Sequence, residues 1–157
     1  MNVLVAVSDP LFGDAILNFL LKHQWPHSVE FKVISVIEQN GTTPANSGDE
    51  FEFSKSLVDS VSDQLHAEFP AAVVSKVIYS GKPAPEILKT ANEWQADMII
   101  IGSHGKTGFE RAILGSVSNE VVSNCRCSAI VVRRENSDIL NIEFSENDIP
   151  EAMKSYV

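Results

Sequence analysis

Five short apolar runs recur along the chain: VLVAV at 3–7, FKVISVI at 31–37, AVVSKVIY at 72–79, ADMIIIG at 96–102 and SAIVV at 128–132. Each run is shorter than an ordinary helix, and most are rich in β-branched residues. Runs of this kind are typical of strands that are buried on both faces of a sheet. The pattern therefore predicts five strands.

Between these runs the apolar residues recur at helical spacing. A first helix is expected over 11–20 and is closed by Trp25-Pro26, and a second is expected over 53–69. A third falls within 80–95, and a fourth begins near Gly115-Ser116. The residues from Glu38 to Glu50 show no periodicity and predict a mobile loop after the second strand. Strands that alternate with helices predict an α/β fold: a parallel sheet with right-handed crossovers and helices on both faces.

The length and charge of the chain indicate a single-domain protein that neither spans a membrane nor binds nucleic acid. The 157 residues suit one domain, and no apolar run approaches the roughly 20 residues needed to cross a bilayer. The formal net charge of −9 argues against nucleic acid as a partner, because phosphate backbones require clustered Lys and Arg. Much of this charge follows Arg134. We therefore expect a domain over 1–134 and an acidic C-terminal tail over 135–157.

Two further features bear on the compartment. The first residues, MNVLVAVSDP, have neither the basic start nor the long apolar run of a signal peptide, so we expect a cytoplasmic protein. Cys125 and Cys127 are separated by one residue, which is too close for an ordinary disulfide, and no second pair completes a zinc site. They are interpreted as reduced thiols.

The letters Gly105-Lys106-Thr107 suggest a phosphate-binding P-loop, but the spacing excludes one. The motif requires a glycine at position 100, which is Ile, and it must lead directly into a helix, whereas Gly108 follows Thr107. The dinucleotide pattern GxGxxG is also excluded, because the turn after the first strand reads SDPLFGD. Neither common phosphate loop is present.

A different glycine pattern follows the fourth strand: Gly102, two residues, Gly105, nine residues, then Gly115-Ser116. Glycines directly after a strand let a ligand approach the main chain, and the free N–H groups of a helix start attract phosphate oxygens. In the simpler alternative, Gly102 and Gly105 form a tight turn and Ser116 only caps a helix. The combination at one strand end favours a phosphate site.

With this spacing the chain resembles the universal stress protein family, in its ATP-binding branch. The segment from ADMIIIGSHG to LGSVS is the most specific part, and VLVAVSD and CSAIVVRR support it over residues 1 to about 134. The resemblance implies a doubly wound five-stranded sheet in the order 3-2-1-4-5, similar to the adenine nucleotide alpha hydrolases. In that order strands one and four meet at the point where the strand order reverses, which is where such folds bind ligands.

The resemblance also implies an ATP site. On the ribose and adenine side it implicates Val7, Ser8, Asp9 and Val36; for the phosphates it implicates Gly102, Gly105, Gly115, Ser116, Val117 and Ser118. Ile101, Ser103, His104 and Arg111 are further candidates for contact with the nucleotide. Instead of binding phosphate, Arg111 could pair with Glu110 or face solvent. Likewise, His104 could simply fill the turn rather than contact the ligand. One departure is Pro10-Leu11-Phe12 after Asp9, where many relatives carry small hydroxyl residues; it puts the ribose edge or a bound metal in doubt.

These sequence features are compatible with three hypotheses for the function. The first is a regulatory protein of the stress response that binds ATP, with Mg²⁺ or Mn²⁺ on the phosphates, as a homodimer formed through residues 129–132. The second is a slow metal-dependent ATP hydrolase centred on Asp9, for which the sequence offers no matched acid–base pair beyond His104. The third is a dimeric interaction module that binds no nucleotide. We expect a binding protein rather than an enzyme, and an unknown protein partner for the tail.

Overall fold

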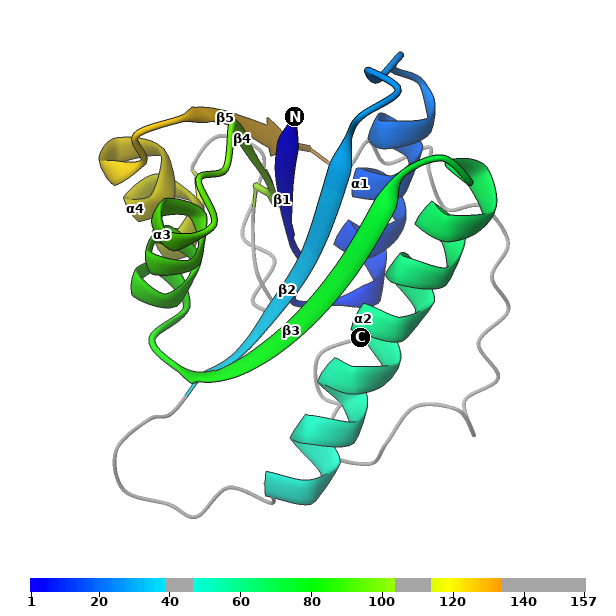
Figure 1. Cartoon of the computed structure of the whole chain (residues 1–157). Coiled ribbons are helices and arrows are strands. Elements are labelled where there is room, and N and C mark those ends of the chain that lie inside the picture. Colours follow the sequence, from blue (N-terminus) through cyan, green and yellow to red (C-terminus); the bar gives the residue numbers. More distant parts are fainter. Residues whose placement is uncertain (39–46, 104–113, 134–157) are drawn as a thin grey trace.

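Five strands and four helices alternate along the chain in the computed structural model, which describes residues 1–38, 47–103 and 114–133 (Figure 1). In chain order they are β1 (Asn2–Ala6), α1 (Pro10–Leu21), β2 (Glu30–Glu38), α2 (Ser47–Glu68), β3 (Val73–Gly81), α3 (Pro83–Glu93), β4 (Met98–Gly102), α4 (Ser116–Asn124) and β5 (Ser128–Val132). The expected α/β alternation is confirmed.

The strands form one parallel sheet in the order β3-β2-β1-β4-β5. In β1, Val3 lies opposite Phe31 of β2 on one side and opposite Met98 of β4 on the other. The chain winds outward from β1 to β3 and then returns to continue from β4 on the opposite side of β1. The strand order therefore reverses between β1 and β4, as the resemblance implies.

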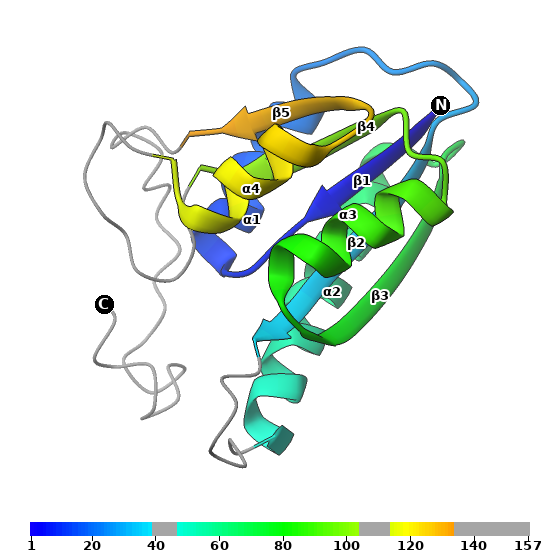
Figure 2. The ribbon, with the colours of Figure 1, turned by 90° about the vertical axis from the view of Figure 1, so that its left-hand side faces the viewer.

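Helices cover both faces of the sheet: α1 and α2 lie on one side, and α3 and α4 lie on the other (Figures 1 and 2). Alternate side chains of β1 pack against the helices on the two faces of the sheet, because successive side chains of a strand point to opposite faces. Val3, Val5 and Val7 belong to the apolar cluster under α1 and α2, and Leu4 and Ala6 belong to the cluster under α3 and α4. This double burial explains why the strands read as continuous apolar runs.

Two expected helix boundaries are wrong. Helix α1 ends at Leu21, before Trp25-Pro26, and the Trp25 indole nitrogen donates to the Leu20 carbonyl oxygen at 2.8 Å. Helix α2 begins at Ser47, so the last residues of the stretch expected to be a loop are helical. Asp49 and Glu50 in its first turn favour this start, because acidic side chains interact well with the positive end of the helix dipole. Within the described residues, no helix is long and apolar enough to span a membrane.

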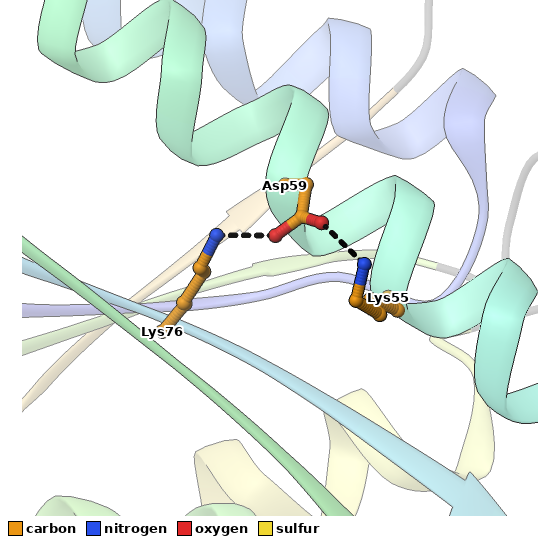
Figure 3. Close-up of polar contacts among 3 residues, drawn as sticks. All are labelled: Lys55, Asp59 and Lys76. Carbon is orange, nitrogen blue, oxygen red and sulfur yellow. Dashed lines mark hydrogen bonds and ion pairs between the residues drawn. The ribbon is translucent and has the colours of Figure 1, made fainter.

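An ion-pair network joins α2 to β3. The Asp59 carboxylate lies between Lys55, at 3.3 Å on the same helix, and Lys76 of β3, which contacts its other oxygen (Figure 3). The hydrogen bond from Lys76 lowers the pKa of the Asp59 carboxyl below its ordinary value of 3.8, and Lys55 acts in the same direction. Because the folded-state pKa is lowered, the pairs contribute stability above pH 3.8, and this contribution is lost as the pH falls through the folded pKa.

We therefore expect Asp59→Asn to lower the melting temperature slightly at neutral pH. The difference from the native chain should shrink as the pH falls below 3.8, and it should also shrink in high salt, because the three side chains are partly exposed. Thermal unfolding of both chains at neutral pH and at a pH below 3.8 measures this difference in melting temperature. Glu52→Gln, on the same helix, is the control. An equal difference at both pH values would show that Asp59 acts through packing.

Candidate functional site

The carboxyl ends of β1 and β4 lie side by side at the point where the strand order reverses. Ala6 is paired with Ile101 of β4, and the Val7 amide donates to the Ile34 carbonyl of β2 at 2.9 Å. Ligands of open α/β sheets bind at such a point. The turns that follow the two strands, from Val7 and from Gly102 onward, therefore form the candidate site.

Asp9 holds the turn between β1 and α1. Its backbone is extended, and one carboxylate oxygen accepts the Phe12 amide at 3.0 Å, so Asp9 is the N-cap of α1, with Pro10 at the first helical position. The Ser8 hydroxyl donates to the other oxygen at 3.5 Å. The sequence predicted a ligand-binding role for Asp9 and missed the cap. The signal was the order Asp-Pro before an apolar helix.

Asp14 brings a second carboxyl group to this end of α1. Its pKa is raised, first by burial and then by repulsion from the Asp9 carboxylate. The sequence reasoning did not single out Asp14, because a helical Asp near a helix start is common. Together, Asp9 and Asp14 make the β1–α1 turn acidic beside the predicted phosphate side.

Gly102, at the end of β4, lies against the Phe12 ring. A methyl group built on Gly102 would lie 2.7 Å from Phe12 Cδ1 and 2.8 Å from Cγ, which is closer than side chains pack. The sequence predicted that this glycine leaves room for a ligand. In the structure, the space beside its Cα is filled by Phe12, so packing alone is enough to require glycine at this position.

Ser103, the residue after β4, forms hydrogen bonds both to β5 and to the start of α4. Its amide donates to the Val132 carbonyl at 2.8 Å, and its own carbonyl accepts the Gly115 amide at 2.7 Å and the Ser118 hydroxyl at 3.0 Å. Ser118 is 2% exposed, and its hydroxyl also lies 3.0 Å from the Gly115 carbonyl. These bonds place the start of α4 directly beside the end of β4.

Replacing Ser118 by alanine should lower the free energy of unfolding by about 1 kcal/mol, because a buried hydroxyl donor is removed while the Gly115 amide still satisfies the Ser103 carbonyl. Urea unfolding followed by circular dichroism measures the change. Ser123→Ala, on the exposed side of α4, is the matched control and should cost much less. Equal costs would mean that the Ser118 bonds add nothing to stability.

The first turn of α4 presents backbone donors next to this strand end. Gly115 is its N-cap, with φ −58° and ψ 156°, and the first helical bond runs from the Asn119 amide to the Gly115 carbonyl at 2.9 Å. Amides of the first turn have no partner within their own helix, and they carry the positive end of its dipole. Ser116 and Val117 lie in this turn with Ser118.

The remaining predicted residues fall into two groups. Val36 is half-buried near the end of β2, two residues beyond the carbonyl that binds Val7, and Ile101 is buried within β4. They lie at the same end of the sheet as Asp9 and Gly102. His104, Gly105 and Arg111 lie outside the described residues, so their predicted roles remain predictions.

The amino-acid sequence of the chain is similar to sequences of known proteins. A model of the Universal stress protein family matches residues 1–133. Universal stress protein MJ0577 of Methanocaldococcus jannaschii is 36% identical over 86 residues, which make up 55% of this chain and 52% of that protein. Universal stress protein MJ0531 of the same organism is 46% identical over 54 residues, or 34% of this chain and 32% of that protein. The aligned segments thus span about a third to a half of these relatives.

Solved structures share the fold over more of the chain. Hypothetical protein MJ0577 superposes with a TM-score of 0.67 at 25% identity, covering 87% of this chain and 97% of that chain. The universal stress protein from Archaeoglobus fulgidus in complex with dAMP gives 0.64 at 19% identity, covering 84% and 97%. A universal stress protein family protein from Arabidopsis thaliana with AMP bound gives 0.60 at 16% identity, covering 87% and 93%.

Proposed function

The chain belongs to the universal stress protein family, and on that premise we propose that it binds an adenine nucleotide, ATP in our assignment, and acts as a regulatory protein of the stress response. One observation supports the site above all: the Ser103 carbonyl holds the Gly115 amide at 2.7 Å, which brings the first turn of α4 beside the end of β4. The fold neighbours with dAMP and AMP support an adenine nucleotide as the ligand class.

In the proposed complex the phosphates lie at the amino end of α4. The amides of Ser116, Val117 and Ser118 would donate to phosphate oxygens, and the end of β4 at Gly102 and Ser103 would lie beside them. His104, Gly105 and Arg111 complete the predicted phosphate side. The charge of the ligand offsets the positive end of the α4 dipole, so no P-loop lysine is required.

The nucleoside is assigned to the β1 side. Ribose hydroxyls would donate to the Asp9 carboxylate, whose oxygens can each accept more than one hydrogen bond, so the cap on the Phe12 amide can be kept. Val7, Ser8 and Val36 line the adenine side. In the described residues, no three His, Cys, Asp or Glu side chains gather into a metal site. The Mg²⁺ or Mn²⁺ of the proposed complex would bind together with the phosphates.

Calorimetric titration tests this proposal. ATP and AMP are titrated separately into the full chain, each with and without Mg²⁺, and we expect ATP to bind with a Kd below about 1 mM. Tighter binding of ATP with Mg²⁺ than without it would support a metal on the phosphates. Binding of AMP alone would reject ATP as the ligand but keep the site, and no binding of either nucleotide would reject the function.

We also propose that the chain is a homodimer that pairs through residues 129–132. Strand β5 is at the edge of the sheet, and Ala129, Ile130 and Val131 are only half-buried in the single chain. An apolar edge strand invites pairing with another chain, and a symmetric partner would cover it. Light scattering decides this: a mass of one chain at micromolar concentration would reject the dimer.

A further inference from the structure

A hollow lies at the opposite end of the sheet from the proposed nucleotide site. Helices α3 and α4 pack side by side (Figures 1 and 2), and their last turns line an open cavity of about 450 Å³. The wall includes Gln95 and Ala96, just before β4, and Cys127, just before β5. The volume lies within the roughly 300–1,000 Å³ of small-molecule pockets.

The two cysteines of the chain both line this cavity. Cys125 is the C-cap residue of α4; its thiol donates to the Cys127 carbonyl at 3.2 Å, and its sulfur lies 3.7 Å from the Val122 carbonyl oxygen. Both thiols are half-buried and unpaired by any disulfide. Two free thiols therefore lie at the wall of this cavity.

The charge of the wall is opposite to that of the protein. Lys89 of α3 and Arg126, which stands between the two cysteines, line the cavity, together with the amide side chains of Asn92 and Gln95. None of the described residues that line it carries a carboxylate. The cavity wall is therefore locally basic in a chain with a net charge of −9.

From these observations we propose that the α3–α4 cavity is a modification site, where Cys125 forms a mixed disulfide with a small carboxylate-bearing thiol supplied as its disulfide. Lys89 and Arg126 attract the carboxylates, and the amide side chains offer further hydrogen bonds. The site is distinct from the nucleotide site, and the proposal does not depend on nucleotide binding.

The chemistry is an ordinary exchange. Cys125 loses its proton to water, and its thiolate attacks one sulfur of the small disulfide; that S–S bond breaks, a new S–S bond to Cys125 forms, and the other half leaves as a thiolate that takes up a proton. Burial, followed by the nearby Cys125 and Asp97, raises the pKa of the Cys127 thiol above its ordinary value, which lowers the fraction of Cys127 present as thiolate. The Asp97 carboxylate accepts the Asn2 amide at 2.7 Å and does not line the cavity.

The test compares three disulfides that differ in charge: oxidised glutathione (anionic), bis(2-hydroxyethyl) disulfide (neutral) and cystamine (cationic). Intact-mass spectrometry of the full chain gives each rate, and peptide mapping gives the site. We expect one glutathione adduct, on Cys125, that Cys125→Ser abolishes and Cys127→Ser leaves in place. Adducts mainly on Cys127, or a loss of two mass units with no retained adduct, would overturn the proposal.

Variants at Lys89 and Arg126 test whether these cations attract the anionic disulfide, or whether Cys125 reacts only because its thiol is exposed. Lys89→Gln with Arg126→Gln should slow the glutathione reaction by about three- to tenfold at low salt and leave the neutral disulfide unchanged, and the difference should shrink in high salt. Lys82→Gln, at the other end of α3, is the matched control and should change neither rate. An unchanged glutathione rate in the double variant, or a faster reaction with cystamine in the native chain, would overturn the proposal.

Discussion

Replacing Gly115 by valine is expected to abolish binding of adenine nucleotide while the fold is retained. The backbone of Gly115, at φ −58° and ψ 156°, is close to the polyproline II conformation and has the negative φ of ordinary residues, so a valine is accommodated there without a left-handed backbone. Its side chain would instead occupy the space at the amino end of α4 that the proposed phosphates approach. We expect at least a 100-fold loss of affinity, about 2.7 kcal/mol, in calorimetric titration with ATP.

A matched change on the same helix separates this effect from damage to α4. Ser123→Val adds a similar side chain on the exposed side of α4 and should bind ATP as the native chain does. Circular dichroism should show folded protein for both variants, with only the small cost at Gly115 of replacing a favourable N-cap residue. Full affinity in Gly115→Val would show that the phosphates do not approach this residue.

Replacing Gly102 by alanine should lower the free energy of unfolding by about 1–3 kcal/mol, the usual cost of adding a methyl group to a packed site. The new methyl group would lie within 3.1 Å of three atoms of Phe12, including its Cβ, so the ring must move. For a chain of this length, we expect the melting temperature to fall by about 2–4 °C per kcal/mol. Thermal and urea unfolding both measure the change.

The double variant identifies the cause. In a Phe12→Ala background the ring is absent, and Gly102→Ala should cost much less than it does in the native chain. Gly13→Ala in α1 is a useful control, because its methyl group would meet Leu57 and Val61 at the ordinary contact distances of 3.4 and 3.5 Å and a helical glycine is replaced by a better helix former. An equal cost of Gly102→Ala in both backgrounds would contradict a clash with Phe12.

Local pattern was enough to predict the strands and the alternation of elements. Strand β5 was predicted at its observed bounds, because SAIVV stands out from the polar residues before it. The order of the strands came from the resemblance, since five similar apolar runs do not by themselves say which strands are neighbours. The start of α2 at Ser47 was missed because an apolar stripe begins only at Phe53, and the acidic first turn was read as loop.

The candidate site was predictable as a set of positions but not as a set of contacts. The spacing of Gly102, Gly115 and Ser116 pointed to the end of β4 and the start of α4, which the structure brings side by side. The contact of Gly102 with Phe12 joins residues that are far apart in the sequence, and it exists only because β1 and β4 are neighbours. The bond between Ser103 and Gly115 likewise depends on how α4 returns to the sheet.

The division of the apolar interior by the sheet has a consequence for local opening. Among the described residues, sixteen buried side chains lie in the cluster that includes α1 and α2, and nine lie in the cluster that includes α3 and α4. Segments with fewer buried apolar contacts open at a lower free energy than the whole domain. Amide hydrogens of α4 should therefore exchange with solvent before those of α1. We therefore expect the helix assigned to the phosphates to lie in the layer that opens first, and a bound anion to slow its exchange most.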